Sequence, residues 1–235
     1  MPLSTQTSVA LSGCAQHLAR EIHAGAQLWV VAPGLDDHAR HLAVEFVHPA
    51  SVGARAVAAT ALLPGPDRCV IGQLRQHSRS GDVVLSLGDA DAGWAADLSM
   101  RTQAWGTSHV HLGWSARTAE SPLHPRTVLV RVGDGGPAER LLTRTYHLLW
   151  ELTSICLQRT PATVPIVSQN SCAVCADDAS IAEVEAMSDD TTARVRSACG
   201  TVVVDVSLVA PVSAGDLLLI HAGTAIRLLP VGHPL

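Results

Sequence analysis

The C-terminal stretch VVVDVSLVAPVSAGDLLLIHAGTAIRLL (202–229) consists of apolar, β-branched runs separated by turn residues. Within and around it, residues 201–209 and 216–229 are each predicted to be strand-like, as are EVEAM (183–187) and TARVRSA (192–198). Short strands joined by tight turns over about 60 residues favour a small β-barrel. The turns are expected at Asp189-Asp190, Gly200 and Ala214-Gly215-Asp216.

The order and spacing of this stretch resemble the small hydrogenase-maturation chaperones of the HypC/HupF family. The shared features are a strand ending in Ser207-Leu-Val209, a Gly215-Asp216 pair, an apolar strand, and then His221-Ala-Gly-x-Ala-Ile. The resemblance covers about residues 171–231. It implies an OB-like barrel of the HypC type and a role in the assembly of [NiFe]-hydrogenase.

In the HypC/HupF family, a cysteine near the start of the barrel and a histidine help to carry the Fe(CN)2CO fragment. The resemblance therefore implies iron binding by His221 together with Cys175, and Cys172 is a second candidate thiol. Thiolate and imidazole are suitable ligands for a soft iron fragment. The implied partners are the hydrogenase large subunit and other maturation proteins that resemble HypD.

Residues 1–158 alternate between buried strand-like runs and helical runs. The clearest strands are QLWVVA (27–32) and DVVLSLG (82–88), and the longest helix is expected at 136–158. Such alternation predicts an α/β fold with a parallel sheet flanked by helices on both faces. The other predicted elements are helices at 8–24, 35–48, 69–79 and 91–106, and strands at 54–63, 109–115 and 127–132.

The two patterns meet at a proline-containing segment without periodicity, RTPATVPIVSQN. Proline and small polar residues in such a segment are typical of a linker. We therefore expect an α/β domain over 1–158, a linker over 159–170, and a β-barrel domain over 171–235.

Residues 1–158 resemble SIS domains, in particular phosphoheptose isomerases, at His41-Leu-Ala-Val-Glu45 and Thr145-Tyr-His147. In those isomerases, a glutamate and a histidine at these places act as base and acid, which implies these roles for Glu45 and His147. Some members add a zinc site, and the matching positions here are His41, Glu45, Glu139 and His147. The resemblance also implies a homo-oligomer formed through this domain.

The loops that hold phosphate in SIS domains differ in this chain. Leu35 stands where a phosphate-binding serine is expected, and carboxylates follow the first and the central strand. These negative charges would repel a phosphate dianion at helix N-termini that otherwise bind one. We therefore predict that the domain is a degenerate scaffold, and that the alternative function is metal-assisted sugar-phosphate isomerisation. The carboxylates are Asp36, Asp37, Asp89 and Asp91.

Composition narrows the remaining function classes. The formal net charge is −5 and no basic stripe occurs, which argues against nucleic-acid binding. No apolar run reaches about 18 residues, so we expect no membrane span. The N-terminus lacks the pattern of a signal peptide, which predicts a cytoplasmic protein. Four scattered cysteines are expected to be reduced and buried; they are Cys14, Cys69, Cys156 and Cys199.

Overall fold

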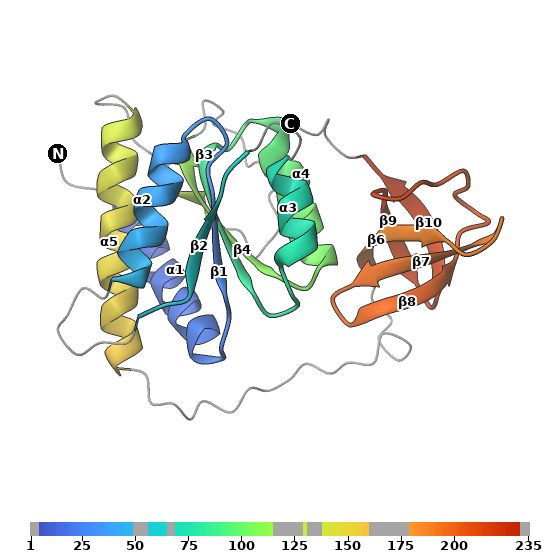
Figure 1. Cartoon of the computed structure of the whole chain (residues 1–235), viewed down its shortest axis with the longest axis horizontal. Coiled ribbons are helices and arrows are strands. Elements are labelled where there is room, and N and C mark those ends of the chain that lie inside the picture. The colour runs from blue at the N-terminus through green and yellow to red at the C-terminus, as the bar shows by residue number, and fades with distance from the viewer. Residues whose placement is uncertain are drawn as a thin grey trace.

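The computed structural model describes residues 5–48, 56–64, 69–114, 129–130, 138–159 and 179–230. It contains an α/β unit and a β-barrel that packs against it (Figure 1). The helices are α1 (Thr5–His23), α2 (Asp36–Val47), α3 (Val70–His77), α4 (Gly93–Ala104) and α5 (Ala138–Arg159). The strands of the α/β unit are β1 (Leu28–Val31), β2 (Ala59–Leu62), β3 (Val83–Asp89), β4 (Ser108–Trp114) and β5 (Leu129–Val130).

The sheet of the α/β unit is parallel throughout, in the order β2-β1-β3-β4-β5. Helices α1, α2 and α5 cover one face, and α3 and α4 cover the other (Figure 1). Because both faces are covered, the central strands β1 and β3 are apolar and buried along nearly their whole length. The predicted α/β class is therefore confirmed.

Helix α2 shows how the pattern of the sequence places side chains. Its buried residues are Ala39, Leu42, Ala43 and Phe46, whose spacing of three and one follows the helical period. This stripe packs into the core between the sheet and α5. The polar residues of α2 therefore lie on its other sides.

The barrel is built from β6 (Ser180–Met187), β7 (Thr192–Ser197), β8 (Gly200–Asp205), β9 (Leu217–His221) and β10 (Thr224–Leu229). It closes in the order β10-β8-β7-β6-β9. All pairs are antiparallel except β8 with β10, which meet in parallel at Asp205 and Thr224 alone. A closed five-stranded barrel with this strand order is OB-like, as predicted.

One prediction about the barrel is wrong: residues 216–229 are a hairpin and not a single strand-like run. The chain reverses at Ala222 and Gly223, where φ is 48° and 82°. Positive φ at both central residues is the geometry of a type I′ hairpin turn. Apolar residues continue on both sides of this turn, so the sequence pattern does not reveal that the chain reverses there.

Several other boundaries and one burial prediction also change. The strand expected at 54–63 is the shorter β2, and the one expected at 201–209 ends at Asp205, where a turn follows. The expected linker lies outside the described residues, because they stop at Arg159 and resume at Ala179. Cys14 is buried, but Cys69 and Cys156 are only partly buried and Cys199 is exposed, contrary to expectation; all four are free thiols. None of the described helices is long and apolar enough to cross a membrane.

Candidate functional site

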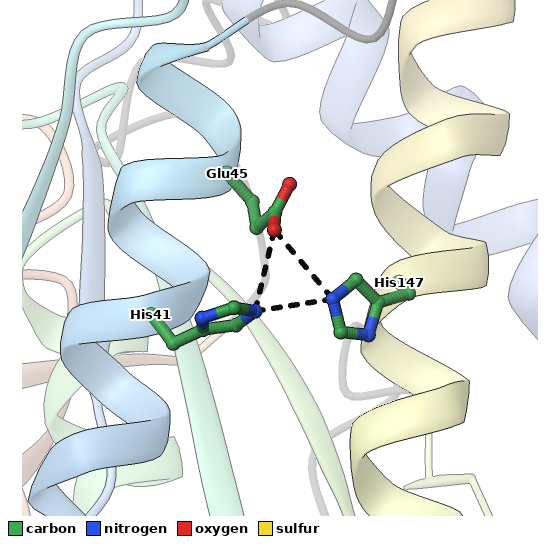
Figure 2. Close-up of side chains that lie close together, drawn as sticks. All are labelled: His41, Glu45 and His147. Atoms are coloured by element: carbon green, nitrogen blue, oxygen red, sulfur yellow. Dashed lines mark hydrogen bonds and ion pairs between the residues drawn. The ribbon is translucent and has the colours of Figure 1, made fainter.

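Three polar side chains converge between α2 and α5. His41 and Glu45 lie one turn apart on α2, which places both on the same side of the helix. His147 points toward them from α5 (Figure 2). The side chains remain accessible, with 48% of His41, 22% of Glu45 and 35% of His147 exposed. The structure thus brings together three residues that the sequence predicted as metal ligands.

The three ligand atoms form a nearly equilateral triangle. Nε2 of His41 lies 3.1 Å from Nε2 of His147 and 3.2 Å from Oε1 of Glu45. Nε2 of His147 lies 3.5 Å from the same carboxylate oxygen. Two ligands of one tetrahedral zinc ion, each at about 2.0 to 2.1 Å, are separated by about 3.4 Å. The donor set and its spacing therefore fit a divalent metal ion.

The tautomer of His147 is fixed by its own helix. The Nδ1–H group of His147 donates to the carbonyl oxygen of Thr143 at 2.8 Å. In the neutral ring this leaves Nε2 unprotonated and directed at His41 and Glu45. A backbone carbonyl that orients a ligating imidazole in this way is a recurrent feature of metal sites.

The ring of Tyr146 packs beside both imidazole rings of the cluster. Its ring lies 5.8 Å from that of His41 and 4.9 Å from that of His147, and its hydroxyl group is 3.3 Å from Nδ1 of His38. The side chain is buried, and burial raises the pKa of the phenol. Tyr146 therefore stays neutral and limits the positions available to the two imidazole rings.

Glu139, the fourth predicted ligand, is not placed at this cluster by any described contact. It lies in the first turn of α5, and its side chain is outside the described residues. His147 is eight positions further along the helix, which is about 12 Å along its axis. Among the described residues, the cluster therefore consists of three ligands, and a tetrahedral ion held by these three alone would keep one open position.

The carboxyl ends of β1 and β3 carry no hydroxyl groups that cap the helices after them. Leu35 stands at the N-cap of α2 and Ala92 at the N-cap of α4, and neither side chain accepts a hydrogen bond there. Asp36 and Asp37 occupy the first turn of α2. Oδ1 of Asp89 accepts from the backbone N–H of Asp91 at 2.9 Å. The backbone donors at this edge are thus accompanied by carboxylates, which oppose phosphate.

Apolar side chains occupy the crevice at the same edge of the sheet. Trp94 lies against Gly88, and its ring is 5.9 Å from that of His111. A small cavity of about 60 Å³ remains there, lined by apolar residues of β1, α3 and α4 and by two prolines. A surface of this composition does not provide the polar contacts that a sugar needs.

In the barrel, the structure places only one of the three predicted iron ligands. His221 ends β9 beside the Ala222-Gly223 turn and is partly buried. It pairs with Thr224 across the hairpin. Cys172 and Cys175 lie outside the described residues. Of the predicted iron ligands, His221 is therefore the one whose position the structure describes.

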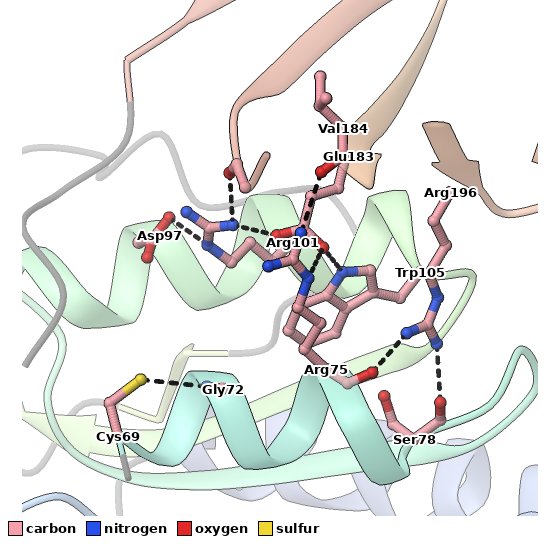
Figure 3. A network of polar contacts seen from close by, with 11 residues as sticks. Cys69, Gly72, Arg75, Ser78, Asp97, Arg101, Trp105, Glu183, Val184 and Arg196 are labelled. Atoms are coloured by element: carbon pink, nitrogen blue, oxygen red, sulfur yellow. Dashed lines mark hydrogen bonds and ion pairs between the residues drawn. The ribbon is translucent and has the colours of Figure 1, made fainter. Parts of the chain in front are cut away.

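Sequence reasoning missed a buried polar network that joins the two units (Figure 3). Glu183 of β6 is 1% exposed and accepts hydrogen bonds from Trp105 Nε1 and from Arg101. Arg101 also donates to the carbonyl oxygen of Gly215 at 2.9 Å. Arg75 of α3 lies 3.2 Å from the same glutamate.

The sequence does contain a signal for this network. Asp97, Arg101 and Trp105 recur every four residues and so form one stripe along α4. All three are buried, which is uncommon for charged residues unless they are paired. Together with Glu183 in a strand that is buried on both faces, the stripe indicates that another unit packs on α4.

A second buried polar group lies within the sheet of the α/β unit. The hydroxyl group of Ser86 is 2.8 Å from Nε2 of His109 and 2.7 Å from Nδ1 of His111. Nε2–H of His111 donates to the carbonyl oxygen of Gly88 at 3.2 Å, so Ser86 donates to Nδ1. Burial lowers the pKa of His111 to about 4, and the ring is therefore neutral. These bonds join β3 to β4.

Comparison with known proteins gives structural likeness at low sequence identity. No family model matches the sequence, and no curated protein matches it. A phosphoheptose isomerase from Francisella tularensis is similar with 12% identity and a TM-score of 0.49, over 66% of this chain and 93% of that one. The C-terminal domain of glucosamine-fructose-6-phosphate aminotransferase from the same organism gives 11% and 0.44, over 63% of this chain and 40% of that one. The sugar isomerase domain of an RpiR transcription factor from Sphaerobacter thermophilus gives 12% and 0.41, over 61% and 78%.

Proposed function

We propose that this chain is an accessory factor in [NiFe]-hydrogenase assembly, and that its barrel carries the Fe(CN)2CO fragment as cargo. The observation that carries the proposal is the position of His221 in an OB-like barrel. The His-Ala-Gly motif forms the end of β9 and a tight turn, which holds the imidazole at a partly exposed hairpin. A carrier needs a ligand that can both receive and release its cargo, and such a position provides access.

The ligand chemistry agrees with this role. His221 would supply one imidazole, and Cys175 or Cys172 would supply a thiolate. These are ligand types that bind a soft iron fragment. The α/β unit would then be a scaffold that has lost its phosphate site, and it would place the barrel for the hydrogenase large subunit and for maturation proteins resembling HypD.

The test combines spectroscopy with maturation in the native host. Protein purified without oxygen should show infrared bands of CO and cyanide, and these bands should be absent from His221→Ala and from the double variant Cys172→Ala/Cys175→Ala. Hydrogenase activity in the host should be lost in the same variants. Cys199→Ala is the matched control, because this thiol is exposed on the barrel but lies outside the motif. Normal hydrogenase activity in the double variant would overturn the proposal.

A second candidate function is supported by the cluster of His41, Glu45 and His147. These residues would hold a divalent ion, whose chemistry is to polarise a carbonyl oxygen as a Lewis acid. Glu45 and His147 are also the residues implied as base and acid for the aldose–ketose shift. One nitrogen or oxygen atom cannot hold a metal and transfer a proton at the same time, so the two roles exclude each other at these atoms.

The carboxylates at the edge of the sheet make sugar phosphates unsuitable substrates for this second function. An isomerase acting here would need a substrate without a phosphate dianion. The discriminating measurement is turnover of neutral aldoses and of aldose phosphates with and without added zinc, with Glu45→Gln as the inactive control. Turnover of a neutral aldose that depends on Glu45 would favour the isomerase over the scaffold.

A further inference from the structure

A cavity of about 350 Å³ lies between the α/β unit and the barrel. Helix α4 and the start of β4 form one wall, and the start of β6 with the β7–β8 turn forms the other. Small-molecule sites typically have volumes of about 300 to 1,000 Å³ and often lie where two structural units meet. The polar residues that line this cavity are Ser99, Thr102, Gln103, Thr107 and His109. All of them except Gln103 are buried, so the polar wall lies below the protein surface.

The register of two barrel strands places His221 at the edge of this cavity. β6 and β9 are antiparallel, with Ser180 paired to Ile220. In such a pair the next position places His221 opposite Ala179. Ala179 is one of the residues that line the cavity.

The alternation of side chains along β9 places His221 on the face of the barrel that is turned toward α4. Leu218 and Ile220 belong to the core of the barrel, whereas Leu217 packs in the apolar cluster that includes Leu98 of α4. Successive side chains of a strand point to opposite faces, so His221 shares the outer face with Leu217. The predicted iron ligand and the cavity therefore lie on the same side of the barrel.

We propose that this cavity holds the Fe(CN)2CO cargo and that the α/β unit supplies one of its walls. The inference rests on the proposed function of the barrel, and it adds the groups that surround the iron fragment. A ferrous ion with two cyanides and one CO has no net charge. The described lining contains no Asp, Glu, Lys or Arg, so it matches a neutral fragment, whereas a buried charge would need a charged partner.

The lining also matches the two kinds of ligand on the iron. The nitrogen of a bound cyanide accepts hydrogen bonds, and the amide group of Gln103 offers two N–H donors. The hydroxyl groups of Thr102 and Thr107 donate to backbone carbonyl oxygens of α4, so toward the cavity they offer acceptors. Ile181 and Ala198 provide apolar surface, against which CO can lie. Gln103 therefore donates to a cyanide nitrogen of the bound fragment.

The first test fills the cavity and leaves the predicted iron ligands in place. Infrared spectra of the full chain, purified without oxygen, should show the CO and cyanide bands in the native protein and their loss in Ala198→Trp. Cys199→Trp is the matched control, because Cys199 is the adjacent exposed residue of the same turn and does not line the cavity. It should keep the bands, and circular dichroism verifies that both variants fold.

The second test removes the hydrogen bond to cyanide without filling the cavity. Gln103→Leu keeps a side chain of similar size on a partly exposed helix position, so the chain should fold and load its cargo. The cyanide bands should shift relative to the native protein, and they should shift more than the CO band, because the lost donor contacts a cyanide nitrogen.

The outcomes separate this inference from the function on which it rests. Native band intensities in Ala198→Trp would overturn the inference while the carrier function of the barrel stands. Cyanide bands in Gln103→Leu at the native positions would overturn it as well, even where Ala198→Trp loses the cargo. Absence of all bands from the native chain would instead refute the carrier function, and the cavity would lose its proposed cargo with it.

Discussion

The carboxylate of Glu183 accepts the indole Nε1–H of Trp105 at 2.5 Å, and this bond ties the barrel to the α/β unit. Around it, Leu217 of β9 joins the apolar cluster formed by Leu74, Leu98 and Trp105. Arg196 of β7 lies over the Trp105 ring at 5.5 Å and donates to backbone carbonyl groups of α3 and the residue after it. The interface between the barrel and the α/β unit therefore has the composition of a domain core, with the carboxylate of Glu183 at its centre.

Replacement of Glu183 by alanine should destabilise the whole chain. The substitution leaves Arg101 without its buried carboxylate partner, and breaking a buried ion pair costs about 3 to 5 kcal/mol. Urea unfolding followed by circular dichroism measures this loss. Glu185→Ala is the matched control, because Glu185 pairs with Arg194 on the exposed side of the barrel and such pairs contribute at most about 1 kcal/mol. Equal effects of the two substitutions would contradict the central role of Glu183.

The sequence predicts the parallel sheet because β1 and β3 are continuous apolar runs and helices of regular period lie between them. It predicts His41, Glu45 and His147 because each stands in a motif, and four-residue spacing puts two of them on one helix side. It does not predict the Glu183 network, because the partners lie far apart in the chain and only the packing of two units pairs them. The hairpin at Ala222 was missed because alanine is not a usual residue at positive φ.

Sedoheptulose 7-phosphate should not bind to this protein at millimolar concentration. Asp36, Asp37, Asp89 and Asp91 lie in the loops and first turn where a phosphate would be held, and like charges repel in proportion to their proximity. Isothermal titration calorimetry measures this directly. A micromolar dissociation constant for the native chain would contradict the prediction. If the carboxylates are the cause, weak binding should emerge when Asp36 and Asp89 are replaced together by asparagine.

The cluster of His41, Glu45 and His147 should bind about one zinc ion per chain. The measurement is elemental analysis of the variant Cys172→Ser/Cys175→Ser/His221→Ala, purified without chelator, in which the predicted iron ligands are removed. His147→Ala or Glu45→Gln should lower affinity at least tenfold, since each removes one of three ligands. His17→Ala is the control, because His17 lies on α1 beside Arg20 and outside the cluster. Less than about 0.1 metal ion per chain would refute a metal site at the cluster.

His111 should make the folded chain less stable as the pH falls. Its pKa is lowered from 6.5 to about 4 because the ring is buried beside Ser86 and Gly88. Between these two values, the unfolded chain binds a proton at this histidine and the folded chain does not. Stability from this group is therefore complete above pH 6.5 and declines as the pH falls toward 4. One pKa unit corresponds to about 1.4 kcal/mol, so the decline approaches about 3 kcal/mol.

The measurement is the free energy of unfolding in urea at several pH values between 7 and 4.5. His111→Asn should be less stable than the native chain at neutral pH, because it disrupts the bonds that join β3 to β4. Its stability should nevertheless fall less steeply with decreasing pH, because one proton fewer is taken up on unfolding. His23→Asn should retain the native slope, since the His23 ring is exposed on α1. Parallel slopes for His111→Asn and the native chain would show that this imidazole is charged in the folded state, which would contradict the donor and acceptor assignment of the Ser86–His111 bond.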